Sequence, residues 1–218
     1  MPKSATLAIN ERSLQLERKG RHIYRFGLGQ SPFPVPDSVV KALQMNAHQK
    51  DYLQVQGLSD LRHAVAVFHQ KTDNVDIQPE NVMIGPGSKE LMFLLQLTFY
   101  GELLIPSPCW VSYMPQAQIL GRNIRLINTR AEENFCLSPK HLHEHCEREN
   151  DPHRPRLLIL NYPSNPTGYS YTEDELAEIA EIANHNNILV LSDEIYSQIH
   201  HEGRHRSIAQ FYPDCTIV

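Results

Sequence analysis

The sequence lacks the features of a membrane-spanning or secreted protein. Its longest apolar run, LMFLLQLTFY at residues 91–100, is too short to cross a bilayer. The first 30 residues carry scattered charges and no apolar segment of the kind that a secretory signal needs. No CxxC spacing links the four cysteines, which are Cys109, Cys136, Cys146 and Cys215. These absences predict a cytoplasmic protein with reduced thiols.

A strong excess of positive charge is also missing. The formal net charge is -5 and the sequence pI is about 6.2, so the chain has no excess of basic residues of the kind that binds nucleic acid or an anionic membrane. The chain contains no internal repeat, no low-complexity segment and no flexible linker. What it does contain is an ordinary globular composition, 41% hydrophobic and 21% charged over 218 residues, which is enough to bury a core.

From Asn81 onward, short apolar runs alternate with segments of helical period. The runs predict strands at 81–85, 102–106, 123–128, 156–161, 188–192 and, as the start of a further strand, 215–218. The segments between them predict helices at 88–99, 110–120, 138–148 and 172–186, after earlier helices at 38–49 and 60–70. Strand-helix alternation predicts an α/β fold, with a mostly parallel sheet and helices on both faces. We expect residues 1–30 to form an N-terminal arm and residues 31–218 to form the main domain.

The best-specified unit runs from the strand at 156–161 to the strand at 188–192. Between them, Thr172 and Glu175 have the spacing of a capping box, and the apolar residues that follow fall on one helix face. A right-handed crossover makes the two strands parallel, so their carboxyl ends meet at one edge of the sheet. Ligands of open α/β folds bind outside that edge, and we therefore expect Asn165 and Asp193 to face one pocket.

Four motifs resemble those of class I/II aminotransferases, which are fold-type I enzymes that use pyridoxal 5'-phosphate. They are YLQVQGLSDLR at 52–62, GPGSKEL at 85–91, NYPSNPTG at 161–168 and SDEIY at 192–196. The resemblance extends from about Gly27 to Val218 and keeps the order of the motifs in the family. It implies that residues 31–218 are an incomplete pyridoxal-phosphate-binding large domain, and that residues 1–30 are an arm with part of the small domain.

The resemblance assigns three residues to the aromatic ring of the cofactor. Asp193 would pair with the pyridine nitrogen and keep it protonated, so that the ring can draw electrons from the substrate. Asn165 and Tyr196 would hydrogen-bond the phenolic oxygen. Structural alternatives exist for each: an acid that caps a helix, a turn residue, and a half-buried aromatic.

The loop GPGSKE would hold the phosphate. It lies between a predicted strand and a helix, where backbone N–H groups of Ser88 and Lys89 suit an anion and Gly87 lets the backbone approach closely. It is not a Walker loop, because the G-x-x-x-x-G-K-[ST] spacing does not fit. GLGQSP at 27–32 is not a dinucleotide fingerprint either, because its third glycine is missing. A plain turn is the alternative interpretation of GPGSKE.

Three further residues are assigned by the resemblance alone. Trp110, the single Trp, matches the aromatic residue that stacks on the cofactor ring, although a core Trp is the alternative. Tyr52 matches a tyrosine that reaches the phosphate of the other subunit, which implies a homodimer. Gly29 matches a glycine near the substrate carboxylate, and a turn glycine is its alternative. The prolines at 108 and 166 match family prolines that follow cis peptide bonds.

A metal site is a weaker interpretation of the segment HLHEHCE. His141, His145 and Cys146 have roughly helical spacing, but a zinc site needs about four ligands in a closed geometry. We favour a solvated helix face and predict no metal.

The family's Schiff-base lysine has no match among these residues. That lysine follows SDEIY and one more strand, in an S-x-S-K-like motif, and would lie beyond Val218. We therefore expect an N-terminal part of a longer aminotransferase, inactive by itself, that moves an amino group between an amino acid and a 2-oxo acid. The alternatives are a pyridoxal-phosphate lyase, either a C–S lyase or an aminocyclopropane-carboxylate-synthase-like enzyme, and an inactive cofactor-binding remnant.

Overall fold

The computed structural model describes residues 5–26, 29, 31–149, 151, 153–199 and 203–218. The chain forms two compact units, residues 1–52 and residues 53–218. The first unit contains helix α1 (Ala5–Arg18) and helix α2 (Asp37–Asn46), and no residue of α2 is buried. Within it, the Arg25 guanidinium pairs with the carboxylate of Glu17. The predicted division at residue 30 stays a prediction.

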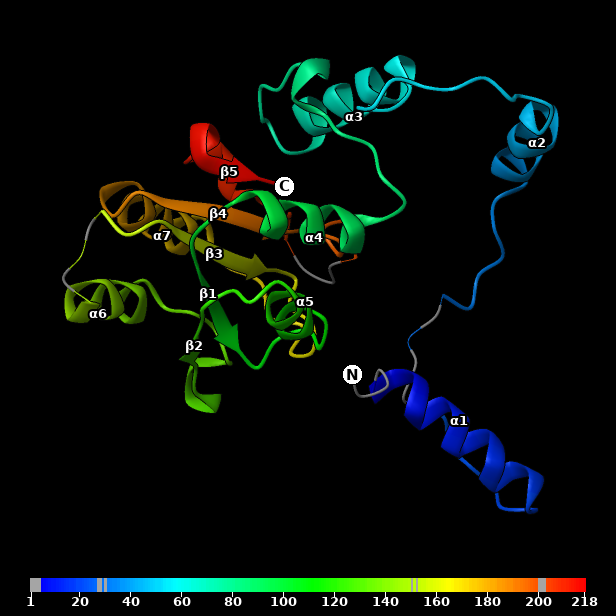
Figure 1. The fold of residues 1–218 in the computed structure, drawn as a ribbon, viewed down its shortest axis with the longest axis horizontal. Coiled ribbons are helices and arrows are strands. Elements are labelled where there is room, and N and C mark those ends of the chain that lie inside the picture. Colours follow the sequence, from blue (N-terminus) through cyan, green and yellow to red (C-terminus); the bar gives the residue numbers. More distant parts are fainter. Residues whose placement is uncertain (1–4, 27–28, 30, 150, 152, 200–202) are drawn as a thin grey trace. The chain divides into compact units, whose positions relative to one another are not determined.

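The second unit is built on a five-stranded parallel sheet in the order β2-β1-β3-β4-β5 (Figure 1). The strands are β1 (Glu102–Ser107), β2 (Ile124–Asn128), β3 (Arg156–Asn161), β4 (Ile188–Asp193) and β5 (Thr216–Ile217). All four pairings are parallel, which confirms the predicted sheet.

Helices cover both faces of this sheet. On β3, Leu158 and Leu160 enter one core, and Leu157 and Ile159 enter the other, so both faces of the strand are buried. The first core contains side chains of helices α6 and α7, and the second contains side chains of α4 and α5. The helices of this unit are α3 (Ser59–Thr72), α4 (Ser88–Thr98), α5 (Tyr113–Ile119), α6 (Pro139–Glu149) and α7 (Glu173–His185). Among the described residues, none of the helices has the length and apolar character that a membrane span requires.

Helix α7 begins as the sequence predicts. The Thr172 hydroxyl accepts a hydrogen bond from the Glu175 N–H at 3.2 Å, and the Glu175 carboxylate accepts one from the Thr172 N–H at 2.8 Å. The buried face consists of Leu176, Ile179, Ala180 and Ala183. This helix therefore returns the chain to the sheet as a parallel crossover between β3 and β4.

The predicted strand at 81–85 is wrong. Asn81 ends a 3-10 turn that begins at Pro79, Val82 after it is extended, and residues 82–85 join no sheet. The Ile84 N–H donates instead to the Gln56 carbonyl at 2.9 Å. Gly57 permits this approach, since a Cβ added to it would lie 2.6 Å from the Ile84 Cβ. The motif at 52–62 thus supplies the backbone partner that a neighbouring strand would otherwise provide.

Two helix starts also differ from the prediction. Helix α5 begins at Tyr113 rather than at Trp110. Helix α3 begins at Ser59, one residue before the predicted start at residue 60, and Leu58 holds the cap position without a side-chain hydrogen bond.

Candidate functional site

The ends of β3 and β4 lie side by side and are joined by the Asn161 side chain. Asn161 and Asp193 are register partners. The Asn161 Nδ2 donates to the Asp193 carbonyl at 2.8 Å, and its Oδ1 accepts from the Asn165 N–H at 2.7 Å. The turn that carries Asn165 is therefore fixed to the end of β4. The Asn165–Pro166 and Ser107–Pro108 peptide bonds are cis, as the resemblance predicts, and Tyr162–Pro163 is cis as well.

Tyr113 holds the carboxylate of Asp193. Its hydroxyl donates to Asp193 Oδ2 at 2.5 Å, and the side chain is almost fully buried on α5. Burial, and then the charge of Asp193, raise the pKa of Tyr113 far above its usual value, so the phenol keeps its proton and remains a donor. The hydrogen bond from this buried donor fixes the orientation of the Asp193 carboxylate.

Sequence reasoning missed Tyr113. A buried tyrosine in a helix has the same local pattern as any core aromatic residue. The available signal was its place three residues after Trp110, whose ring it contacts edge-on with centroids 5.4 Å apart.

A pocket lies at this edge of the sheet. The space within it is about 400 Å³, which includes volume open to solvent. Five residues that the resemblance assigns to the cofactor line it, together with Tyr113, Asn161 and Ile195. The five are Ser88, Trp110, Asn165, Asp193 and Tyr196. The structure therefore brings the acid and the start of α4 to one cavity, while the roles of these residues stay predictions.

The start of α4 has the backbone of an anion site. Gly87 precedes the helix with φ 97°, a conformation that favours glycine, and a Cβ added there would meet no atom within 4 Å. No side chain caps the helix. The Glu90 N–H donates to the Gly87 carbonyl at 3.2 Å, so it is the N–H groups of Ser88 and Lys89 that suit another acceptor. The Lys89 ammonium lies 5.4 Å from the centroid of the Trp110 ring, which places this cation beside a pocket residue.

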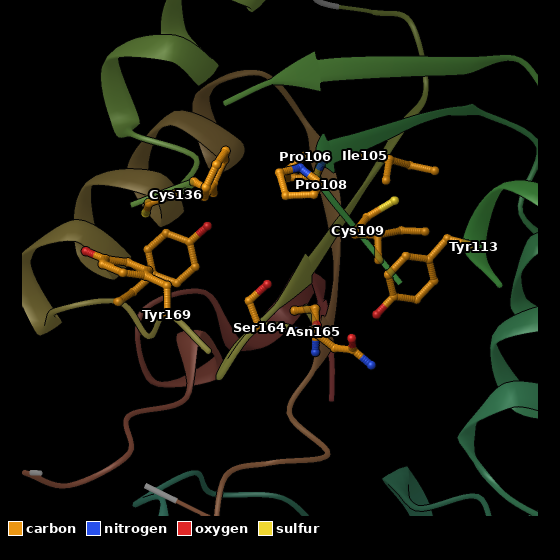
Figure 2. A pocket seen from close by; sticks show the side chains of 13 residues that line it. Ile105, Pro106, Pro108, Cys109, Tyr113, Cys136, Ser164, Asn165 and Tyr169 are labelled. Atoms are coloured by element: carbon orange, nitrogen blue, oxygen red, sulfur yellow. Dashed lines mark hydrogen bonds between the residues drawn. The ribbon is translucent and has the colours of Figure 1, made fainter. Parts of the chain in front are cut away.

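A second pocket adjoins the first and shares Tyr113, Asn161 and Asn165 with it. Figure 2 shows Cys109 beside Tyr113 on one side of this second pocket, and Cys136 beside Tyr169 on the other. Burial raises the pKa of Cys109, and that of Cys136 to about 12. Both thiols therefore keep their protons at neutral pH, which disfavours a nucleophilic role.

The remaining predicted site residues belong to the first unit. Tyr52 is fully exposed and Gly29 is exposed too. Residues 27, 28 and 30, which belong to the same GLGQSP motif, lie outside the described residues. The roles predicted for Tyr52 and Gly29 stay predictions.

In the segment considered for zinc, the His141 Nδ1 lies 3.5 Å from a carboxylate oxygen of Glu133. No group of three or more potential metal ligands occurs within the part of the chain that the structure describes.

Comparison with known proteins identifies the family. The family model described as "Aminotransferase class I and II" matches residues 21–217. The fold and the pocket residues agree with this match, and the chain belongs to the class I and II aminotransferase family.

The relatives and the solved structures that the chain matches are longer than the chain. An aspartate aminotransferase of Bacillus subtilis is 31% identical over 213 residues, which cover 95% of this chain and 53% of the relative. An aspartate/prephenate aminotransferase of Thermus thermophilus is 30% identical over 222 residues, which cover 100% of this chain and 56% of the relative. The structure of a Thermus thermophilus aspartate aminotransferase with maleate superimposes with a TM-score of 0.88 at 29% identity, covering 99% of this chain and 56% of that one. The chain thus spans about half the length of these relatives.

Proposed function

We propose that this chain supplies the cofactor-binding part of a pyridoxal-phosphate-dependent aminotransferase, which moves an amino group between an amino acid and a 2-oxo acid. The observation that carries the proposal is the pocket that joins the Asp193 carboxylate to the uncapped start of α4. By the full-length protein we mean a chain of the relatives' length that includes these 218 residues.

The residues present fit the chemistry of pyridoxal 5'-phosphate, the cofactor of this family. The N–H groups at the start of α4 suit the phosphate dianion, since the helix dipole is positive there. The Asp193 carboxylate suits a protonated pyridine nitrogen. The Asn165 amide and the Tyr196 hydroxyl are donors for a phenolic oxygen, and the Trp110 indole offers a flat apolar surface for the ring.

Three residues of the chain have separate proposed roles in this chemistry. When bound, the cofactor supplies an electron sink for the bond that breaks at the substrate's alpha carbon. Asp193 holds a proton on the ring nitrogen, which requires an ionised carboxylate. Tyr113 orients that carboxylate, because its hydroxyl donates to it from a buried position. Asn161 fixes the Asp193 main chain and the Asn165 turn together.

The relatives support transfer over the lyase and remnant alternatives. The Bacillus subtilis and Thermus thermophilus proteins are named as aspartate or aspartate/prephenate aminotransferases. An amino acid and a 2-oxo acid are therefore the proposed substrates, and a dicarboxylic amino acid such as aspartate is the first to test.

The proposed assembly is a cytoplasmic homodimer in which Tyr52 of one subunit reaches the phosphate site of the other. All four cysteines are free, which suits a reducing compartment. The full exposure of Tyr52 leaves its hydroxyl available to a partner. A full-length protein that sediments as a monomer and keeps its activity would contradict the dimer.

The function is tested by an Asp193→Asn variant of the full-length protein. We expect the rate of transfer from aspartate to a 2-oxo acid to fall by several orders of magnitude, because a neutral amide cannot keep the ring nitrogen protonated. Asp174→Asn, which changes an exposed carboxylate at the start of α7, is the matched control and should leave the rate unchanged. Equal rates for the Asp193 variant and the unmodified protein would refute the proposed role of Asp193.

A further inference from the structure

A second carboxylate, Glu194, is buried immediately after Asp193 and is absent from the lining of the pocket. Only 8% of the residue is exposed. Its Oε1 accepts hydrogen bonds from the hydroxyls of Ser192 at 2.7 Å, Ser207 at 2.8 Å and Tyr162 at 3.0 Å. Its Oε2 lies 2.6 Å from the His205 Nε2. Glu194 thus accepts from four groups on three separate segments of the chain.

The group around Glu194 is costly to bury. His205 is buried with it and stacks on the Tyr162 ring at 5.3 Å, while the His205 Nδ1 has no hydrogen-bond partner within the described residues. Burial, and then the charge of Glu194, raise the pKa of Tyr162, which keeps this phenol a donor. A buried ionic cluster is often no more stable than apolar residues of the same volume. Stability alone therefore gives little reason for this arrangement.

The cluster lies at the end of β4, where the strand has a partner strand on one side only. On one side, β3 pairs with β4 as far as Asp193. On the other side, β5 pairs only with Val190 and Leu191, so the last two residues of β4 extend past it. His205 and Ser207, from the segment before β5, contact the Glu194 carboxylate, which follows the last residue of β4. Side-chain hydrogen bonds therefore hold the end of β4 at the point where its pairing with β5 stops.

Tyr162 connects the cluster to Asp193. Its N–H donates to the Asp193 carbonyl at 3.3 Å, and its hydroxyl donates to Glu194. The same hydroxyl accepts from the Ile208 N–H at 2.7 Å. The main chain of Asp193 is thus held from β3 and, through Glu194, from residues 205–208.

We propose that Glu194 is a positioning residue for Asp193, and that Tyr162, Ser192, His205 and Ser207 fix it in that role. The proposal rests on the proposed function, since it assigns Asp193 to the ring nitrogen of the cofactor. Glu194 touches neither cofactor nor substrate. It holds the end of β4 so that the Asp193 carboxylate meets the ring nitrogen in the geometry that keeps the proton there.

A Glu194→Gln variant of the full-length protein tests this. The matched control is Glu102→Gln, which alters an equally buried carboxylate at the opposite, amino-terminal end of β1, 3.5 Å from Arg125 and from Arg154. Two quantities are measured: the dissociation constant of pyridoxal 5'-phosphate, and the NMR shift of its isotope-labelled ring nitrogen in the bound state.

We expect Glu194→Gln to weaken binding about tenfold, the scale of one lost hydrogen bond to a charged group, and to move the nitrogen resonance toward the unprotonated form. Glu102→Gln should change only thermal stability. If Glu194→Gln does not fold, Ser207→Ala, which removes one donor, should give a smaller shift in the same direction. A folded variant with the unmodified protein's resonance and affinity would show that Glu194 is merely structural. If the unmodified protein bound no pyridoxal 5'-phosphate, the proposed function would fail and the positioning role of Glu194 with it.

Discussion

Asp193 depends on a residue that lies eighty positions away in the sequence. The Tyr113 hydroxyl donates to its carboxylate from an almost fully buried position on α5. A carboxylate in open water adopts many orientations. The Asp193 carboxylate is held in one orientation by Tyr113 before any ligand binds. That preparation removes part of the cost of binding, because the group need not be ordered when the cofactor enters.

Removing the Tyr113 hydroxyl should weaken cofactor binding. In Tyr113→Phe the ring still fills its place in the core, but the Asp193 carboxylate loses a charge-assisted hydrogen bond of roughly 1.5–3 kcal/mol. We expect affinity for pyridoxal 5'-phosphate to fall about tenfold or more, measured by equilibrium titration of the full-length protein. Tyr100→Phe is the control, since Tyr100 is 84% exposed and does not line the pocket. Equal affinities in the two variants would exclude this role for Tyr113.

At the scale of elements, the crossover β3-α7-β4 sets the distance between the Asn165 turn and Asp193. Its helix starts with the capping box at Thr172 and packs four apolar residues against the sheet. The two strand ends therefore cannot separate without losing both the ladder and the helix face.

Thr172→Ala should destabilise this unit by about 1 kcal/mol, the usual value of an N-terminal cap. The loss arises because the Glu175 N–H would lose its acceptor at the start of α7. Denaturant unfolding of the full-length protein measures it. Thr172→Ser restores a hydroxyl in the same place and should recover most of the loss, so a serine variant as unstable as the alanine variant would count against the cap.

Hydrophobic periodicity alone predicts most of these elements. A helix with one buried face, such as α7, shows apolar residues at a regular helical spacing in its sequence. The strands β1, β3 and β4 are equally clear as continuous apolar runs that are buried on both faces. The error at 81–85 has a physical origin. An alternating extended segment needs a backbone partner, and its pattern does not say whether that partner is a strand or, as here, the loop at Gln56.

The site could be predicted only where a motif marks it. Asp193 is the last residue of β4, and Asn165 lies in the turn that follows β3, both within distinctive sequence motifs. Tyr113 lines the pocket and Glu194 lies next to Asp193 outside its lining, and the contacts of both join segments that are distant in the sequence. Such contacts leave no local pattern, and the place of Tyr113 three residues after Trp110 is the one sequence signal for it.

At the scale of the whole molecule, two buried tyrosines and one partly buried tyrosine make its stability depend on pH. Burial is the first cause that raises the pKa of Tyr113, Tyr162 and Tyr171 above the usual value for tyrosine. A group whose pKa is raised on folding contributes stability below its unfolded pKa, which is about 10 for tyrosine, and loses that contribution as the pH rises toward the folded pKa.

We therefore expect the free energy of unfolding to fall progressively above about pH 10. Ionisation of these three residues should accompany unfolding rather than precede it. Tyrosinate absorbance and circular dichroism, recorded together during an alkaline titration of the full-length protein, measure both events. Complete ionisation of the tyrosines in a chain that keeps its native dichroism would contradict this expectation.

A crystal structure of the full-length protein with pyridoxal 5'-phosphate tests the proposed cofactor site most directly. We predict the phosphate at the first turn of α4, beside Ser88, and the ring nitrogen within about 2.6–3.2 Å of an Asp193 carboxylate oxygen. We also expect Tyr113 to donate still to the other side of that carboxylate. A cofactor bound elsewhere, or one whose ring nitrogen faces away from Asp193, would contradict the proposed site.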